Sequence, residues 1–463
     1  MIGSSAAKAN RWLLAVLMVL LICAVLNATL SWVVFEWAAA LSFVVLCVIG
    51  FRSFTIREHS LLAAAVLIGL GLLLFTDKRA TVLSALDLAA FFAAFIAALT
   101  AMRDVAARSR SILAVGRYLI VQPPGRRFYS TAIGGHLLGV FLNFGAVSLM
   151  SPLIQESVKD ANGITDQDLE RRQISALIRG FAWVLLWAPT TLSQAVLLTI
   201  FTEVTWADIA PLGIATAIAF VILGRLYDRF EWRGVARSGQ PFKPEIPWRA
   251  ILSVGALCAL LIGSTIVGSG LTGATIALVL MCVAPVVTLM WFMAQKPPKA
   301  FDEFWLRIRA LGGVLTPSAP ALARSAVALG LSGFIGRCLG QALPVEALSQ
   351  AVDLSAIPGW IFLSALPVII SLGGQIALSP ILLVVLLGEI LRGVDMLPTG
   401  QLQILFALSV GWALSMTASP NATATLLISA TSRIPPTTLT WAWNLKYGLL
   451  CYACSIVIFF FIA

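Results

Sequence analysis

The stretch RWLLAVLMVLLICAVLNATLSWVVFEWAAALSFVVLCVIGF, residues 11–51, contains a single charged side chain, Glu36, after its opening arginine. It is long enough for two membrane crossings, because a helix needs about 20 apolar residues to cross the hydrocarbon core. The chain of 463 residues is 60% apolar and 11% charged, whereas a soluble domain carries about 25% charged residues. Without the alternating pattern of β-strands, this composition predicts an all-α polytopic membrane protein.

The remaining composition excludes several classes of function. The net charge of +10 comes from basic residues that collect in loops, which is the distribution expected on one face of a membrane and not of a nucleic-acid-binding protein. The chain has only two histidines, so a histidine-based metal site is not expected. The first apolar run, from Trp12 to Leu30, is longer than the 7–15 residues typical of a signal peptide core. We therefore expect an uncleaved first span.

Two glycine-bearing apolar segments do not fit simple crossings. Residues 131–154 contain Gly134-Gly135-His136, and residues 358–391 contain Gly373-Gly374-Gln375. The second segment is too long for one helix and too short for two crossings with a turn. The second segment is therefore predicted to be a re-entrant hairpin, and the placement of the basic segments predicts the same for the first. The predicted ordinary spans are 12–30, 31–51, 60–75, 83–102, 174–201, 206–224, 250–267, 272–294, 321–342, 401–431 and 440–462.

Basic segments set the predicted orientation, because lysine and arginine favour the cytoplasmic face. These segments are Lys8 to Arg11, Arg52 to Arg57, 103–127, 225–249 and 296–309. They lie on one side only if the hairpin at 131–154 enters and leaves by the same face. The result is about 11 transmembrane helices plus two opposed re-entrant hairpins in inverted-topology repeats, with a cytoplasmic N-terminus.

This orientation divides the chain into four expected parts. Residues 1–30 form an extra N-terminal transmembrane helix, and residues 225–249 form a basic cytoplasmic linker. The first inverted repeat covers 31–224, with the hairpin 131–154 and a broken helix at 174–201. The second inverted repeat covers 250–463, with the hairpin 358–391 and a broken helix at 401–431. Inverted repeats with broken helices are a feature of secondary transporters.

Each broken helix contains polar residues around a proline, in WAPTTLSQ at 187–194 and SMTASPNATATLLIS at 415–429. Proline frees an upstream carbonyl from its usual hydrogen bond. Carbonyl, hydroxyl and amide oxygens are hard ligands suited to sodium, and a helix restarting after a break points its positive end at an anion. The first break offers Thr190, Thr191, Ser193 and Gln194. The predicted substrate- and ion-binding residues are Asn143, Ser148, Thr190, Thr191, Ser193, Gln375, Ser379, Thr417, Ser419, Asn421 and Thr423.

Other interpretations of these residues stay open from the sequence. Proline, serine and threonine also kink helices with their hydroxyls bonded to the preceding turn. Asn143 and Gln375 fit either a hairpin tip or a polar contact between helices. Intramembrane charged residues and His136 fit anion binding or proton transfer, and equally packing or interfacial anchoring. The charged residues in question are Glu36, Asp87, Arg179, Arg324, Arg337, Glu389 and Lys446.

At these residues the chain resembles the ion transporter superfamily, which includes divalent anion–sodium symporters and the large subunits of tripartite periplasmic transporters. The similar pieces are LNFGAVS at 142–148, WAPTTLSQ at 187–194, GGQIALSP at 373–380 and SPNATAT at 419–425. The resemblance implies an elevator motion against a homodimeric scaffold, and it leaves open whether a periplasmic binding protein is a partner. Neither predicted hairpin carries the family's Ser-Asn-Thr tip, so sodium and protons both remain candidates for the coupling ion.

The sequence therefore predicts a secondary active transporter of a small anionic solute, coupled to sodium or protons, in the cytoplasmic (inner) membrane. Its expected partners are the solute and the lipid bilayer, with no nucleic acid and no cofactor other than a sodium ion. One alternative is a membrane-embedded enzyme or subunit for surface lipid or polysaccharide assembly. Short deduced external loops and the lack of a nucleophile beside a base count against an enzyme. Another alternative is a membrane subunit of a multi-component transporter.

Overall fold

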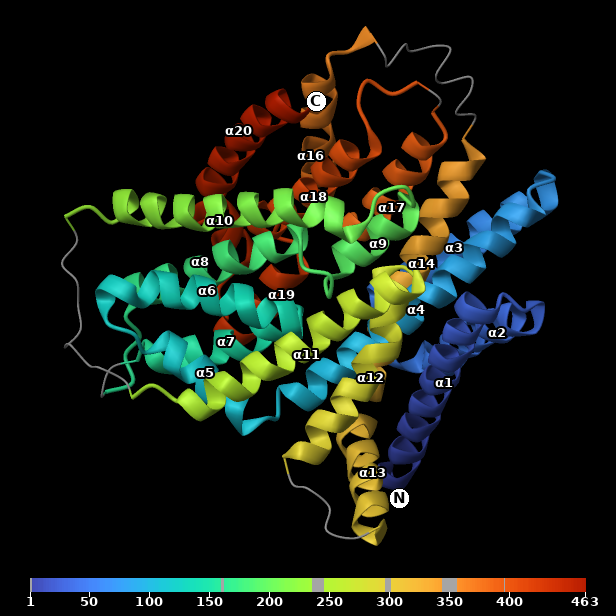
Figure 1. The fold of residues 1–463 in the computed structure, drawn as a ribbon, viewed down its shortest axis with the longest axis horizontal. Coiled ribbons are helices and arrows are strands. Elements are labelled where there is room, and N and C mark those ends of the chain that lie inside the picture. The colour runs from blue at the N-terminus through green and yellow to red at the C-terminus, as the bar shows by residue number, and fades with distance from the viewer. Residues whose placement is uncertain (1, 160–161, 235–244, 296–300, 344–355, 395) are drawn as a thin grey trace. The chain divides into compact units, whose positions relative to one another are not determined.

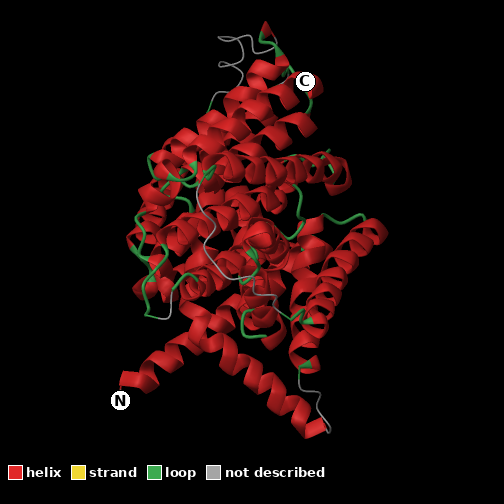
Figure 2. Cartoon of the chain, turned by 90° about the vertical axis from the view of Figure 1, so that its left-hand side faces the viewer, coloured by secondary structure: helices red, strands yellow, loops and turns green. Residues whose placement is uncertain are grey.

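The computed structural model describes the chain apart from residues 1, 160–161, 235–244, 296–300, 344–355 and 395. Throughout the described residues the regular elements are helices, and none is a strand (Figure 1 and Figure 2). Parts of the predicted basic segments 225–249 and 296–309 lie outside the described residues.

Ten helical stretches of the described chain are long and apolar enough to cross a membrane. They cover every predicted span except 174–201, which is divided into shorter helices. The all-helical, polytopic class predicted from composition is therefore confirmed. The ten stretches are Ala7–Leu30, Val33–Ser53, Ile56–Phe75, Arg79–Ala106, Trp206–Glu231, Trp248–Thr272, Ile276–Ala294, Asp302–Ala342, Gln401–Ser432 and Leu445–Ile462.

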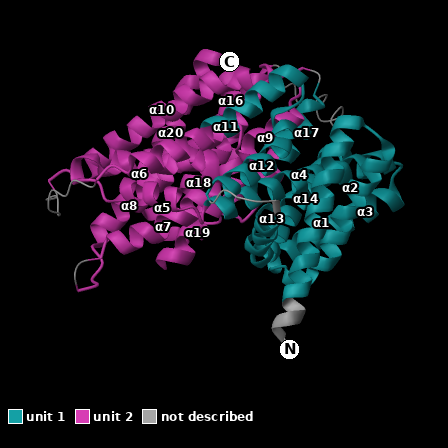
Figure 3. Ribbon diagram, turned by 60° about the horizontal axis from the view of Figure 1, so that its bottom comes forward, with its two compact units in different colours: residues 1–106, 259–351, 385–395 teal, residues 107–258, 352–384, 396–463 magenta. Residues whose placement is uncertain are grey.

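The chain forms two compact units (Figure 3). Unit 1 contains residues 1–106, 259–351 and 385–395, and unit 2 contains residues 107–258, 352–384 and 396–463. Each unit takes segments from both halves of the chain. The units therefore cut across the two predicted repeats, 31–224 and 250–463.

Unit 1 is built around α4 and α14, which pack along much of their length. Small residues permit this approach, because lipid-exposed helices associate through close van der Waals contact. At Gly330 of α14, a β-carbon would come within 2.7 Å of the carbonyl oxygen of Ala89 on α4. The elements of unit 1 are α1 (Ile2–Leu30), α2 (Val33–Gly50), η1 (Phe51–Ser53), α3 (Ile56–Phe75), α4 (Arg79–Ala106), α12 (Ile276–Ala294), α13 (Phe301–Leu315), η3 (Thr316–Ser318) and α14 (Ala319–Ala342).

Unit 2 contains the shorter helices, and two further helices, α11 (Trp248–Thr272) and α17 (Pro380–Arg392), continue from one unit into the other. Within unit 2 the closest pairs are α6 with α8 and α16 with α18. The elements are α5 (Arg110–Ile120), α6 (Pro124–Leu142), α7 (Phe144–Ser157), α8 (Gln167–Phe181), η2 (Ala182–Leu186), α9 (Leu192–Ile200), α10 (Trp206–Glu231), α16 (Gly359–Gln375), α18 (Gln401–Ala418), α19 (Thr423–Ser432), η5 (Thr438–Ala442) and α20 (Leu445–Ile462).

Two pairs of consecutive helices are joined by short turns and are called hairpins here; α6 packs against α7, whereas contacts between α16 and α17 are few. In the first hairpin, α6 and α7 meet at Asn143, whose φ of 52° lies in the left-handed region. In the second hairpin, α16 and α17 are joined by residues 376–379, with Ala377 at a φ of 65°. The first hairpin runs from Pro124 to Ser157 and is longer than the predicted segment 131–154. Its glycine pair, 134–135, lies inside α6 and not at the turn.

Candidate functional site

The first break, residues 187–191, interrupts the helical path between η2 and α9. Pro189 cannot donate a backbone hydrogen bond, which favours an interruption at this position. The hydroxyl of Thr190 donates to the carbonyl oxygen of Val140 in α6. The hydroxyl of Thr191 donates to the carbonyl oxygen of Ala188 at 2.7 Å. The first break is thus attached to the first hairpin close to its turn.

Ser193 and Gln194 follow on the first turn of α9 and bond back to η2. The hydroxyl of Ser193 and Nε2 of Gln194 both donate to the carbonyl oxygen of Leu185, at 3.0 and 2.9 Å. Nε2 of Gln194 also donates to Leu186, at 3.0 Å, and lies 3.2 Å from the hydroxyl of Ser409 on α18. Residues Asn143, Thr190, Thr191, Ser193 and Gln194 are called the first cluster below.

The second break, residues 419–422, separates α18 from α19 and is attached to the second hairpin. The hydroxyl of Ser419 donates to the carbonyl oxygen of Gly374 at 2.7 Å. Nδ2 of Asn421 lies 3.1 Å from the carbonyl oxygens of both Gly374 and Gln375. Nε2 of Gln375 returns a bond to the carbonyl oxygen of Ala418 at 3.1 Å. The second cluster comprises Gln375, Ser379, Ser419, Asn421 and Thr425.

The two breaks correspond position by position. Each new helix, α9 or α19, begins three residues after its proline, Pro189 or Pro420. The residue after each proline, Thr190 or Asn421, bonds a hairpin carbonyl. That carbonyl lies three residues before the left-handed residue of its hairpin: Val140 precedes Asn143, and Gly374 precedes Ala377. A hairpin turn bonded to a helix break therefore occurs twice in the fold.

Both clusters contain buried polar atoms without a hydrogen-bond partner in the described structure. In the first cluster these atoms are Oδ1 and Nδ2 of Asn143 and Oε1 of Gln194. In the second cluster they are the hydroxyls of Ser379 and Thr425. Gln194 and Thr425 each lie five residues after the proline of their break. An unpaired buried polar group costs about 1–3 kcal/mol, so these positions are candidates for contact with a ligand.

His136 of α6 has both ring nitrogens engaged beside the first break. Nε1 of Trp187 donates to Nε2 of His136 at 3.0 Å, because an indole N–H is a donor only. Nδ1 of His136 lies 3.0 Å from the carbonyl oxygen of Gly180, which can only accept. These partners require a neutral ring with its proton on Nδ1. His136 therefore orients α6, α8 and the break, and neither ring nitrogen is free to relay a proton.

The intramembrane arginines considered from the sequence bond to protein groups. Arg179, only 1% exposed, donates to Oδ1 of Asn444 at 2.8 Å and to the carbonyl oxygen of Trp443 at 3.0 Å. In unit 1, Arg337 pairs with Glu389 at 2.8 Å, and Arg324 donates to the carbonyl oxygen of Ser53 at 3.1 Å. These contacts support packing roles and leave the hydroxyl- and amide-bearing clusters as the candidate site.

The sequence-predicted residues divide into those gathered at the breaks and those outside. Ser148 is exposed on α7 and bonds its own helix at Phe144, 3.3 Å away. Thr417 bonds Leu414, 2.9 Å away, within α18. Thr423 begins α19 directly after the second break. The other eight predicted residues belong to the two clusters, together with Gln194.

Several residues of the site were not singled out from the sequence. Trp187 holds His136, Ser409 contacts Gln194, and Nε1 of Trp441 donates to Oε1 of Gln375 at 2.9 Å. Thr425 was visible within the quoted motif SPNATAT, but only its unpaired hydroxyl in the structure distinguishes it. Ser409 and Trp441 carry no local signal, since their partners lie far away in the chain.

Comparisons with known proteins show a similar fold and no sequence relative. No family model matches the chain. No curated protein matches it either. The structure of MtrF from Neisseria gonorrhoeae, described as illuminating a class of antimetabolite efflux pumps, is 14% identical over 88% of this chain and 94% of MtrF, with a TM-score of 0.53. The YdaH transporter of Alcanivorax borkumensis, described as having an unusual topology, is 15% identical over 79% of this chain and 83% of its own, with a TM-score of 0.47. The chain is thus a polytopic helical membrane protein whose fold is similar to that of MtrF.

Proposed function

We propose that this protein is a secondary active transporter of a small anionic solute, and that the two clusters of unit 2 form its binding site. One observation carries the proposal. Each helix break is bonded to a hairpin turn, and each has an unpaired buried polar atom on the helix that follows it. A structural kink requires only satisfied hydroxyls, whereas a binding site retains unpaired groups for its ligand.

The chemistry of the clusters suits a cation and an anion together. Oδ1 of Asn143 and Oε1 of Gln194 are neutral oxygen acceptors of the kind that coordinate sodium. The N-termini of α9 and α19 carry positive ends of helix dipoles next to the breaks. A solute carboxylate at these helix ends would be neutralised in part by the coupled cation.

Sodium fits the clusters better than a proton as the coupling ion. A proton requires a titratable side chain, and the residues of both clusters are hydroxyls and amides. The neighbouring His136 is held neutral by Trp187 and Gly180. No carboxylate is among the cluster residues, so the negative charge that balances sodium would come from the solute. Sodium and substrate would then bind cooperatively, which is what symport requires.

The similar fold of MtrF adds support for a transporter. Because MtrF is described as illuminating a class of antimetabolite efflux pumps, antimetabolites are included among the test solutes. By the resemblance of the sequence motifs, transport would follow an elevator motion in which unit 2 carries the solute. The same resemblance implies a homodimer in the inner membrane.

The proposal is tested first by ligand-dependent unfolding of the purified chain in detergent. We expect sodium, replacing potassium at constant ionic strength, to raise the unfolding temperature, and one member of a panel of small carboxylates and antimetabolites to raise it further. Asn143→Ala removes both unpaired amide atoms of the first cluster and should abolish the sodium-dependent shift. Asn27→Ala is the control, because Asn27 bonds Asp87 in unit 1, at 2.8 Å.

Uptake in proteoliposomes with an imposed sodium gradient provides the second test. Asn421→Ala removes two bonds between the second break and the second hairpin and should abolish uptake while the protein still inserts. Full uptake by this variant would contradict the assignment of the second cluster. If Asn143→Ala kept the full sodium-dependent rise in unfolding temperature, the assignment of the first cluster would be contradicted.

A further inference from the structure

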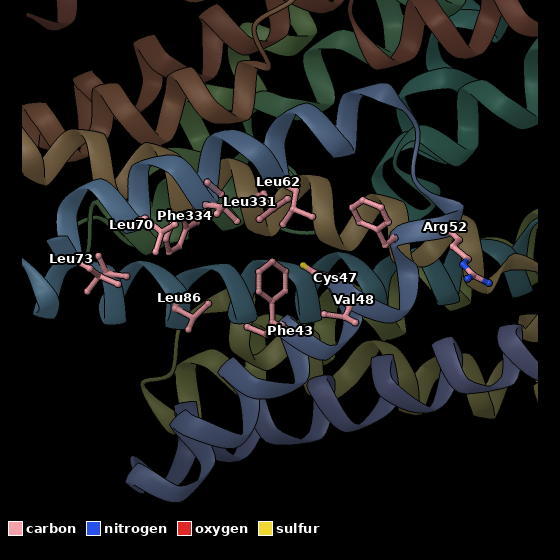
Figure 4. A pocket seen from close by; sticks show the side chains of 16 residues that line it. Phe43, Cys47, Val48, Arg52, Leu62, Leu70, Leu73, Leu86, Leu331 and Phe334 are labelled. Carbon is pink, nitrogen blue, oxygen red and sulfur yellow. The ribbon is translucent and has the colours of Figure 1, made fainter.

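Unit 1 contains a groove that the proposed transport site does not use. Its volume is about 700 Å³, and it is lined by residues of α2, η1, α3, α4 and α14 (Figure 4). Fifteen of its 16 lining residues are uncharged, and the exception is Arg52. Val48, Val66 and Leu70 remain 70%, 50% and 49% exposed. An apolar groove of this size, open along its length, calls for an apolar occupant.

The groove has one polar end. Figure 4 shows Arg52 at one end and Leu73 at the other, with Phe43, Leu70 and Leu86 between them. Arg52 takes part in none of the ion pairs found in the described part of the chain. A long apolar groove that ends at an exposed guanidinium is complementary to an amphiphile with an anionic headgroup. Arginine is well suited to a phosphate, which it binds with paired N–H groups.

The length of the groove matches one half of a bilayer. On α3 its lining extends from Leu62 to Leu73, which is about 16 Å at ~1.5 Å per residue. One leaflet of hydrocarbon is roughly 15 Å deep. Arg52 lies in one of the basic segments that the sequence places at the cytoplasmic face, where anionic lipids are enriched. An acyl chain along α3 would therefore bring its phosphate to the level of Arg52.

We propose that this groove is a binding site for an anionic phospholipid, with acyl chains along α2, α3 and α14 and the headgroup phosphate on Arg52. A second copy of this chain would also cover apolar surface, but the exposed cation at one end favours the lipid. The site lies within unit 1 and does not depend on the proposed transport function.

The test uses the full chain reconstituted with equal amounts of phosphatidylglycerol and phosphatidylcholine that carry the same acyl chains. After transfer to mild detergent, native mass spectrometry counts the retained lipids of each class and the number of protein copies. We expect retained phosphatidylglycerol to exceed phosphatidylcholine. Arg52→Ala should lower this preference about fivefold, since one basic side chain near anionic lipid contributes about 1 kcal/mol. Arg57→Ala is the charge control, because Arg57 is exposed but does not line the groove.

A pair of neighbouring positions on α3 separates the groove from the rest of the lipid-facing surface. Val66 lines the groove, whereas Leu67 is 72% exposed and does not. Val66→Trp should remove bound lipid of both classes, and Leu67→Trp should leave it unchanged. Circular dichroism checks that both variants are folded, and Arg52→Ala provides an independent measurement if Val66→Trp is not.

Two results would overturn the proposal. Equal lipid retention in Arg52→Ala and Arg57→Ala, together with equal retention in the two tryptophan variants, would show that no lipid occupies the groove. Loss of a protein dimer in Val66→Trp with unchanged lipid retention would show that a second copy covers the groove.

Excess inorganic phosphate should leave the lipid in place, because phosphate alone lacks the acyl chains. Release of lipid by phosphate would show that the guanidinium site alone holds the headgroup.

Discussion

The bond between Thr190 and the carbonyl oxygen of Val140 gives a quantitative test of how the first break is attached to its hairpin. Thr190→Val keeps the shape of the side chain and removes the donor. Thr190 is 1% exposed and Val140 is 4% exposed, so water does not replace the lost hydroxyl. Val140 lies in the last turn of α6, where carbonyls lack a partner within the helix.

The expected effect follows from this burial. Leaving a buried carbonyl unpaired costs about 1–3 kcal/mol. If opening of the hairpin restores solvent to this carbonyl, opening becomes about five- to 150-fold more frequent, because each 1.4 kcal/mol is a factor of about ten. Two backbone N–H groups report this opening. That of Asn143 donates to the carbonyl oxygen of Gly139 at 2.8 Å, and that of Ala146 donates to the carbonyl oxygen of Asn143 at 3.0 Å.

Hydrogen exchange measured by mass spectrometry on peptides covering residues 136–150 is the assay. Thr199→Val is the matched control on α9, because its hydroxyl bonds only Ala195 of the same helix, at 2.6 Å. We expect faster exchange at the hairpin turn in Thr190→Val and little change in the control. Equal exchange rates in the two variants would refute the claim that the first break holds the first hairpin.

Two further predictions concern packing in each unit. A β-carbon at Gly180 would come closer to the backbone of Ala132 than two atoms can approach, so Gly180→Ala should abolish folded protein in size-exclusion chromatography. Gly125→Ala is the control, because a β-carbon at Gly125 would have nothing within 4 Å. A normal elution profile for Gly180→Ala would contradict this prediction. Arg337→Ala leaves Glu389, whose side chain is 2% exposed, without its ionic partner and should lower stability in detergent by about 3–5 kcal/mol. Adding Glu389→Gln to Arg337→Ala should restore much of the lost stability. If Arg337→Ala alone were as stable as the wild type, the pair of Arg337 and Glu389 would not be stabilising.

The sequence predicted the membrane-spanning segments well because each is a local property. A helix in hydrocarbon must satisfy its own backbone hydrogen bonds, so apolar length alone identifies it. The interruptions at Pro189 and Pro420 were visible for a similar reason, since proline removes a donor wherever it occurs. The sequence left Asn143 open between a hairpin tip and a polar contact between helices, and the structure places it at the turn with a φ of 52°.

Other features depended on partners that lie far away in the sequence. The glycine pair at 134–135 was expected within the first hairpin, and it lies inside α6, which packs closely against α8. Small residues allow such close helix contacts, but only the fold shows which helix is the partner. Ser409 and Trp441 contact the clusters across long stretches of chain, and nothing near either residue indicates this role.

By itself the sequence determined that the chain is a helical membrane protein, which segments are long and apolar enough to cross a bilayer, and where two helices are broken. These properties follow from hydrophobic length and from the missing N–H of proline, and neither requires a distant partner. The tertiary structure decided which hairpin carbonyl each break bonds, that His136 is held neutral, and which buried polar atoms stay unpaired. Hydrogen bonding is directional and short-ranged, so its pairing is settled only when the helices pack.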